Sequence, residues 1–281
     1  VIDAKLIIIK YLLDRQISEV WGSRSLPHFF TGGEIMSIDW DWGIFFQEAP
    51  FGNTTYLGWL ISGFQVTVAL SLCAWIIAFI VGSFFGILRT VPNRLLSSLG
   101  AIYVELFRNV PLIVQFFTWY LVIPELLPQA IGDWFKMDLT PNIQFFVSSA
   151  LCLGLFTAAR MCEQVRAAIN SLPRGQKAAG LALGLTLPQT YRYVLLPNAY
   201  RVIIPPMTSE MLNLVKNSAI ASTIGLIDMA AQANKLLDYS AKAYESFTAI
   251  TLAYVFINVI IMLIMHWLEK RVRLPGTAGG Q

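Results

Sequence analysis

Residues 61–88 read ISGFQVTVALSLCAWIIAFIVGSFFGIL, and this stretch indicates what kind of protein the chain is. It contains no charged residue. A helix that crosses the hydrocarbon core of a bilayer needs about 20 consecutive, mostly apolar residues. The stretch exceeds that length, so it predicts a transmembrane helix.

The rest of the chain has the same character. Of its 281 residues, 56% are hydrophobic and only 13% are charged, and the mean hydropathy is +0.60. Long apolar runs recur at residues 99–122, 143–162 and 247–268. A weaker run at 198–220 contains Pro205–Pro206 and polar residues, and a membrane tolerates such a segment only where it packs inside protein or lines a cavity. We therefore expect an all-α membrane protein with about five transmembrane helices.

The positions of Lys and Arg predict the orientation of these helices. Cytoplasmic loops of membrane proteins carry an excess of basic residues. Basic residues follow the first run (RTVPNR, 89–94) and the last run (EKRVRLP, 269–275), whereas residues 123–142 carry more acidic than basic residues. The loop between the third and fourth runs, with its edges, carries Arg160, Arg166, Arg174, Lys177, Arg192 and Arg201. We expect the N-terminus outside and the C-terminus in the cytoplasm, with the tryptophans Trp40, Trp42, Trp59, Trp119 and Trp134 as interfacial anchors at the outer ends.

The chain divides into four predicted regions. Residues 1–35 are expected to be an N-terminal extension, because their apolar run 6–13 is broken by Lys10 and is too short to span, whereas MSIDWDW from Met36 reads like a natural start. Residues 36–60 are expected to form a periplasmic segment, 61–275 the transmembrane domain and 276–281 a cytoplasmic tail.

The cytoplasmic loop 173–201 is long, basic and punctuated by glycine. Residues 176–183 favour a short helix with a small apolar face, and Gly184 is expected to end it. Thr186 or Leu187–Pro188 would start a second helix over 189–196, which Pro197 would close. Small residues let a partner backbone approach closely, but a basic amphipathic segment also suits the surface of anionic lipid. The residues alone leave both interpretations open.

The loop resembles the EAA loop of ABC-importer permeases at Gly175–Gln176, Ala179, Gly184 and the ending Val194-Leu195-Leu196-Pro197. It departs from that pattern at Ala178, where a Glu is expected, and at Gly180, where the second Ala is expected. The stretches ELFRNVPLIVQ (105–115) and IPPMTSEMLNLVKNSAIAS (204–222) resemble signatures of the polar amino-acid branch of these permeases. From Met36 to its end, the chain is similar to permeases of glutamate/aspartate importers.

This resemblance implies the transmembrane domain of a type I ABC importer in the bacterial inner membrane. The loop would form a coupling helix that docks on a cytoplasmic ATPase dimer, through Gly175, Gln176, Ala178, Ala179, Gly184, Leu196 and Pro197. The family also uses a second permease chain, identical or paralogous, and a periplasmic amino-acid-binding protein. No G-x4-G-K-[ST] phosphate-binding loop occurs in the sequence, so we expect ATP–Mg to bind the ATPase and this chain to be a transporter subunit, not an enzyme. We expect neither a cofactor in this chain nor a nucleic-acid partner.

Ionisable residues inside a membrane are costly, and they are candidates for function. Glu105 and Arg108 lie three residues apart in the second run, on one helix face. Arg108 would either line the pathway and bind a substrate carboxylate, or pair with Glu105 and hold helices together. The neighbouring Asn109 would bind substrate or cap a kink at Pro111.

The fourth run carries a polar stripe of Glu210, Asn213 and Asn217. A break at Pro205–Pro206 would expose backbone carbonyls beside it. Lys216 would lie near the outer end and meet an acidic substrate or a lipid headgroup. Whether the stripe faces the pathway or a partner permease stays open, and the polar segment 228–246 would form an external gate or a docking surface for the binding protein.

The favoured function is import of acidic amino acids, glutamate and aspartate, by an ATP-driven complex. One alternative is a permease for another polar amino acid, such as glutamine, histidine or arginine. Another is a self-contained channel or secondary transporter with ion sites at Arg108 and Glu210, although such a protein has no need of a docking loop. His28 and His266 lack ligand spacing, so we expect no metal site.

Overall fold

The structure is a computed structural model that describes residues 40–272, without the side chain of Arg174. The chain divides into two units, 1–40 and 41–281, and the following concerns the second unit. Its regular structure within the described range is helical, apart from an isolated bridge between Glu48 and Thr55, and this confirms the all-α prediction. The proposed extension 1–35 and tail 276–281 lie outside the described residues.

Within residues 40–272, three helices are long and apolar enough to cross a membrane: α2 (Tyr56–Leu88), α7 (Pro141–Ser171) and α12 (Ala243–Val272). They coincide with the first, third and last predicted runs, but each extends beyond its run. α7 continues to Ser171, about two and a half turns past the predicted end at residue 162. Several charged residues that the sequence places in or beside a loop, including Arg160 and Arg166, therefore belong to a long helix.

The second predicted run is not one straight helix. α3 (Arg94–Asn109) is followed by α4 (Leu112–Phe117), the π-helix η3 (Thr118–Val122) and α5 (Ile123–Leu126), and the chain bends by 104° between α3 and the segment 112–126. Pro111 lacks an N–H group and cannot continue the helix. The Gln115 side chain donates hydrogen bonds to the carbonyls of Phe107 (2.8 Å) and Val110 (2.9 Å), and it thereby caps the end of α3. Gln115, not Asn109, satisfies these backbone groups.

The fourth predicted run forms α10 (Leu196–Ser218), and the expected break at Pro205–Pro206 is wrong. The helix runs through both prolines, at the cost of two backbone hydrogen bonds. The carbonyls four residues earlier belong to Arg201 and Val202, whose residues are both exposed. Pro197 likewise lies in the first turn of α10, where proline is well tolerated, and does not close the preceding loop.

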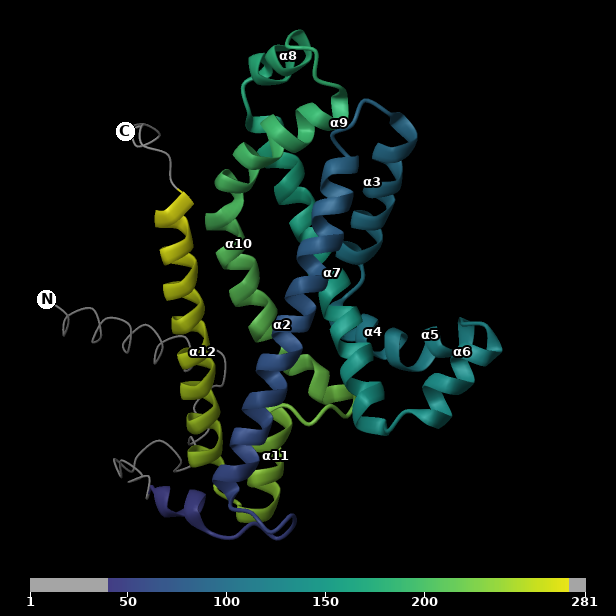
Figure 1. The fold of residues 1–281 in the computed structure, drawn as a ribbon. Helices are drawn as coiled ribbons and strands as arrows, with labels where there is room; N and C mark the ends of the chain where they lie inside the picture. Colours follow the sequence, from purple (N-terminus) through teal and green to yellow (C-terminus); the bar gives the residue numbers. More distant parts are fainter. Residues whose placement is uncertain (1–39, 273–281) are drawn as a thin grey trace, which may run out of the picture. The chain divides into compact units, whose positions relative to one another are not determined.

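Small residues allow α2 and α7 to pack closely along their length. A Cβ atom added at Gly82 would lie 2.6 Å from the Cβ of Met161, and one added at Gly86 would lie 2.7 Å from the Cβ of Val165. Small side chains at such positions let helix backbones approach closely inside a membrane. α10 packs against α7, α2 and α12, so the most polar of the long helices is covered by protein on several sides (Figure 1).

The shorter elements lie at the ends of this bundle. α8 and α9 lie at one end, and α11 lies at the other, where it packs against α2 and α12 (Figure 1). The polar segment 228–246 is thus largely a packed helix, capped by the fully buried Asp228, whose Oδ1 accepts a hydrogen bond from the Ala231 amide at 2.9 Å. The short elements are η2 (Trp42–Phe46), α6 (Gln129–Asp133), η4 (Trp134–Asp138), α8 (Arg174–Ala182), α9 (Leu187–Thr190), η5 (Tyr191–Leu195), η6 (Ala219–Ile224) and α11 (Met229–Ser240).

Candidate functional site

The loop between α7 and α10 has the helix–glycine–helix shape that the sequence predicts. α8 ends at Ala182, and Gly184 reverses the chain with a φ of +80°. The amides of Leu183, Gly184 and Leu185 donate to the carbonyls of Ala179, Leu181 and Gly180, so the last carbonyls of the helix are satisfied. Thr186 begins the next helix, and its amide donates to the Gln189 side chain at 2.8 Å.

Gly180 marks the place where α8 folds back against the following helix. A Cβ atom there would lie 2.8 Å from the Cγ2 of Thr190, a residue with no exposed surface. An alanine at position 180 would push these two helices apart. The departure from the EAA pattern at this position therefore has a local packing reason.

α8 presents small and apolar side chains to its surroundings. Ala178, Ala179 and Ala182 are exposed, and Leu181 and Leu183 are 44% and 82% exposed. The predicted docking residues Gly175 and Gly184 are exposed as well, and Gln176 is half-buried. Leu183 belongs to the small apolar face that the sequence predicts, with Ala178, Ala179 and Ala182, whereas the prediction missed Leu181.

The loop is tied to the long helices by two polar contacts. The Tyr191 hydroxyl donates to the Thr90 carbonyl at 2.8 Å, and so joins η5 to the end of α2. The Asn198 side chain, in the first turn of α10, donates to Gln176 of α8 at 3.4 Å and to the Val194 carbonyl at 2.9 Å. Of the other predicted loop residues, Leu196 is half-buried and Pro197 is exposed.

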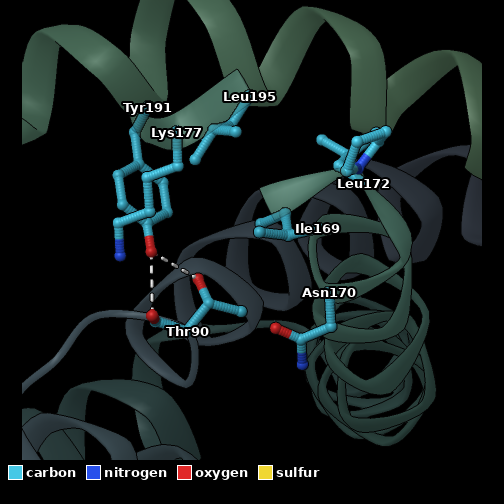
Figure 2. A pocket seen from close by; sticks show the side chains of 8 residues that line it. Thr90, Ile169, Asn170, Leu172, Lys177, Tyr191 and Leu195 are labelled. Atoms are coloured by element: carbon cyan, nitrogen blue, oxygen red, sulfur yellow. Dashed lines mark hydrogen bonds between the residues drawn. The ribbon is translucent and has the colours of Figure 1, made fainter. Parts of the chain in front are cut away.

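A pocket of about 300 Å³ lies beneath the loop. Lys177, Tyr191 and Thr90 lie on one side of it, and Ile169 and Leu172 face them (Figure 2). The complete lining is Thr90, Ile169, Asn170, Leu172, Pro173, Lys177, Tyr191 and Leu195.

A buried carboxylate links the two helices that hold the loop. Arg160 of α7 donates from Nε to Glu210 Oε2 at 2.7 Å and from Nη2 to Glu210 Oε1 at 3.3 Å. Gln164, one turn along α7, donates to Glu210 Oε1 at 3.1 Å. The Glu210 side chain is 10% exposed and that of Arg160 is 41% exposed. The sequence prediction missed this pair because it assigned Arg160 to the cytoplasmic loop and its edges.

A second charged cluster joins α2 to α7 nearer the loop. Glu163 accepts a hydrogen bond from Arg89, which follows the end of α2, and two more from Arg166, at 2.8 Å and 2.9 Å. Glu163 lies three residues after Arg160 on α7. Arginines bound in this way are held in place and partly neutralised.

The predicted pathway residues are divided between two helices. Glu105, Arg108 and Asn109 are exposed at the end of α3, next to the bend, and within residues 40–272 no ion pair joins Glu105 to Arg108. On α10, Asn213 and Asn217 are half-buried and Lys216 is exposed. Both helices pack against α7, but no hydrogen bond in the described range joins the two sets. The described residues also contain no group of three or more His, Cys, Asp or Glu that could hold a metal ion.

Comparison with known proteins defines the class to which this arrangement belongs. Residues 78–274 match the family described as the inner membrane component of binding-protein-dependent transport systems. The matched region includes the last third of α2, the whole loop and the helices that follow. The chain belongs to this family, and it is a multi-pass inner-membrane transporter subunit, not an enzyme.

Individual relatives narrow the comparison. The chain is 82% identical, over 246 residues, to the glutamate/aspartate import permease protein GltJ of Escherichia coli K12, and the match covers 88% of this chain and all of that protein. It is 29% identical to the probable amino-acid permease protein YxeN of Bacillus subtilis, with 85% and 98% of the two chains covered.

Two solved structures share the fold. One is a crystal structure of an amino acid ABC transporter with histidines, with a TM-score of 0.65, 26% identity and coverage of 77% of this chain and 95% of that chain. The other is the MetNI methionine ABC transporter in an inward-facing conformation, with a TM-score of 0.64, 21% identity and coverage of 78% and 98%. At this identity, the second likeness concerns the fold alone. Together they support the assignment to the type I ABC-importer fold.

Proposed function

We propose that this chain is a permease subunit of an ATP-driven ABC importer that carries glutamate and aspartate across the inner membrane. The observation that carries the proposal is the 82% identity to a glutamate/aspartate import permease over that protein's whole length. The helical fold would provide the membrane-spanning part of such a subunit, and the exposed loop would provide its contact with the ATPase.

In this proposal, α8 is the coupling helix that docks on a cytoplasmic ATPase dimer. The exposed small and apolar side chains of α8 support this role, because a partner can approach them closely. The excess of basic residues at this end supports a cytoplasmic position for α8. ATP and Mg²⁺ would bind the ATPase, and this chain would contribute the surface to which the movement of the ATPase is transmitted.

Movement of α8 would pass to the spans through its polar contacts. The Asn198–Gln176 contact ties α8 to α10, and the Tyr191–Thr90 contact ties the loop to the end of α2. The bond between Arg160 and Glu210 then joins α7 to α10, the two helices that enter and leave the loop. A push on α8 would thus tilt α7 and α10 together and would not separate them.

The translocation path would be completed by a second permease chain. Arg108, with Glu105 and Asn109, is exposed in a single chain and would meet either a substrate carboxylate or this second chain. Glu210, Asn213, Lys216 and Asn217 would supply polar groups on the α10 side. A periplasmic amino-acid-binding protein would deliver the substrate to the opposite end from α8.

Reconstitution in proteoliposomes tests the proposal. The chain is co-purified with the ATPase and permease encoded beside it, and ATP hydrolysis is measured with the neighbouring binding protein and glutamate, aspartate, glutamine or histidine. We expect stimulation by glutamate and aspartate alone, with uptake of the same two. Stimulation by glutamine or histidine instead would refute the substrate, and failure to associate with any ATPase would refute the mechanism.

A further inference from the structure

The pocket beneath the loop is not explained by coupling or by transport. It lies where several elements converge: the residues after α2, the last turns of α7, the beginning of α8, and η5. Its volume of about 300 Å³ is sufficient for a small polar group, and its walls are of two kinds. Ile169 and Leu195 are buried apolar residues, whereas Thr90, Asn170 and Lys177 are polar.

Lys177 is the residue that gives the pocket its charge. Its side chain is half-buried, and within residues 40–272 no ion pair or hydrogen bond to its ammonium group is found. Arg89 and Arg166 bind Glu163, and the Arg192 guanidinium lies 5.8 Å from the centroid of the Tyr193 ring, whereas Arg94 and Arg201 are exposed and Lys177 is half-buried. A partly buried cation without a counter-ion attracts an anion.

The position of the pocket indicates the source of that anion. Thr90 lies two residues after the end of α2, and Leu172 directly follows the end of α7. The apolar stretch of α2 continues to Leu88, so on the α2 side the pocket begins directly after a helix that is long and apolar enough to span a membrane. Lipid headgroups lie at the ends of such helices, and basic pockets between helices at that level bind anionic headgroups.

We propose that this pocket binds the phosphate of an anionic phospholipid, with the Lys177 ammonium as its counter-charge. The Asn170 side chain lines the pocket and can donate an amide N–H to the headgroup, whereas the Thr90 hydroxyl already donates to the Ile87 carbonyl. Ile169, Leu172 and Leu195 would adjoin the glycerol end of the acyl chains. Free inorganic phosphate carries the same charged group, but unlike a phospholipid it has no apolar part to pack against Ile169, Leu172 and Leu195. The site is separate from the exposed face of α8, and the proposal does not depend on which substrate is carried.

The test uses the complete importer in nanodiscs that contain equal amounts of phosphatidylglycerol and phosphatidylcholine. Native mass spectrometry then counts the lipids that remain bound as the collision energy rises. We expect Lys177→Gln to lose one tightly held phosphatidylglycerol per copy of this chain, and Lys177→Arg to retain it. Asn170→Trp should also lose it, because an indole at this exposed position fills the pocket while the charge remains. Arg192→Gln is the matched control: it removes one cation from the same loop, outside the pocket, and should retain the lipid.

Three results would overturn the proposal. Equal retention of phosphatidylglycerol in the wild type and in both Lys177→Gln and Asn170→Trp would exclude a lipid site here. Displacement of the bound lipid by millimolar inorganic phosphate would assign the site to the free anion. Loss of ATPase co-purification in Lys177→Gln with unchanged lipid binding would assign Lys177 to a protein contact instead.

Discussion

At the scale of single residues, the ion pair between Arg160 and Glu210 is the contact whose partial loss should cost the most stability. A carboxylate that is only 10% exposed loses most of its hydration, and three hydrogen bonds from Arg160 and Gln164 replace it. Buried ion pairs contribute little net stability, but the removal of one partner is strongly destabilising because the other charge is left buried and uncompensated. Removal of the charge of Arg160 or of Glu210 alone should therefore lower the stability of the protein strongly, whereas removal of both charges should lower it much less.

We predict that Arg160→Gln lowers the stability of the purified complex. The loss should be about 2 kcal/mol, below the 3–5 kcal/mol typical of fully buried pairs because the arginine is partly exposed to its surroundings. The midpoint of thermal unfolding in detergent measures the effect. The double variant Arg160→Gln/Glu210→Gln should recover most of the loss, since no charge is left buried. A double variant as unstable as the sum of the two single changes would contradict this explanation.

Gly184 gives a second prediction at this scale. Its φ of +80° costs a residue with a Cβ about 1 kcal/mol, although the space around it is open. Gly184→Leu should therefore distort the end of α8 and reduce co-purification of the ATPase, while membrane insertion remains normal. Tyr193→Leu is the control, because Tyr193 is exposed in the same loop, has no positive φ and is not one of the predicted docking residues. Normal ATPase binding by Gly184→Leu would refute the role assigned to this turn.

At the scale of helices, the close contact between α2 and α7 organises the bundle. Gly82 and Gly86 lie one turn apart and admit Met161 and Val165 to the α2 backbone. We predict that Gly82→Leu forces the two helices apart and sharply reduces the yield of folded protein in size-exclusion chromatography. Phe84→Leu, at an exposed position in the same turn, should leave the yield unchanged. Equal yields for both variants would show that the contact is not needed.

Apolar length and charge predicted the approximate places of the long helices, but not their bends or ends. The bend after α3 depends on Gln115, a residue that looks like an ordinary polar interruption until its two bonds to backbone carbonyls are known. The predicted break in α10 does not occur. The two prolines suggest a break, but packing against neighbouring helices keeps α10 helical through Pro205–Pro206. Arg160 was misplaced because hydropathy falls before α7 ends.

At the scale of the whole molecule, much of the apolar surface is available to lipid or to other chains. The loop could be predicted from local spacing, since glycine, small residues and proline act within a few positions of one another. The pathway could not be predicted in the same way. Whether Arg108 meets substrate or a second chain depends on surfaces that one chain alone does not supply.

Arg108 is tested at this scale. We predict that Arg108→Gln abolishes glutamate uptake by the reconstituted importer, because the bidentate cation for a carboxylate is lost, while assembly with the ATPase stays intact. Radiolabelled uptake and co-purification measure the two properties separately. Arg94→Gln, at the other, exposed end of α3, is the matched control and should transport normally. Unchanged glutamate uptake by Arg108→Gln would exclude a substrate-binding role.

The charge pair between α7 and α10 also bears on how the protein is made. A lone arginine or acidic residue at the centre of a helix costs about 2.5–3.5 kcal/mol on insertion scales, and α10 is not apolar enough to count as a span by itself. Arg160 and Glu210 offset each other only if both helices are present together. α7 is apolar enough to enter the lipid by itself, so α10 would leave the translocon only where α7 is already present to receive it. In ribosome-bound chains extended beyond α10, Arg160→Gln should keep α10 at the translocon, whereas the wild-type chain should release it.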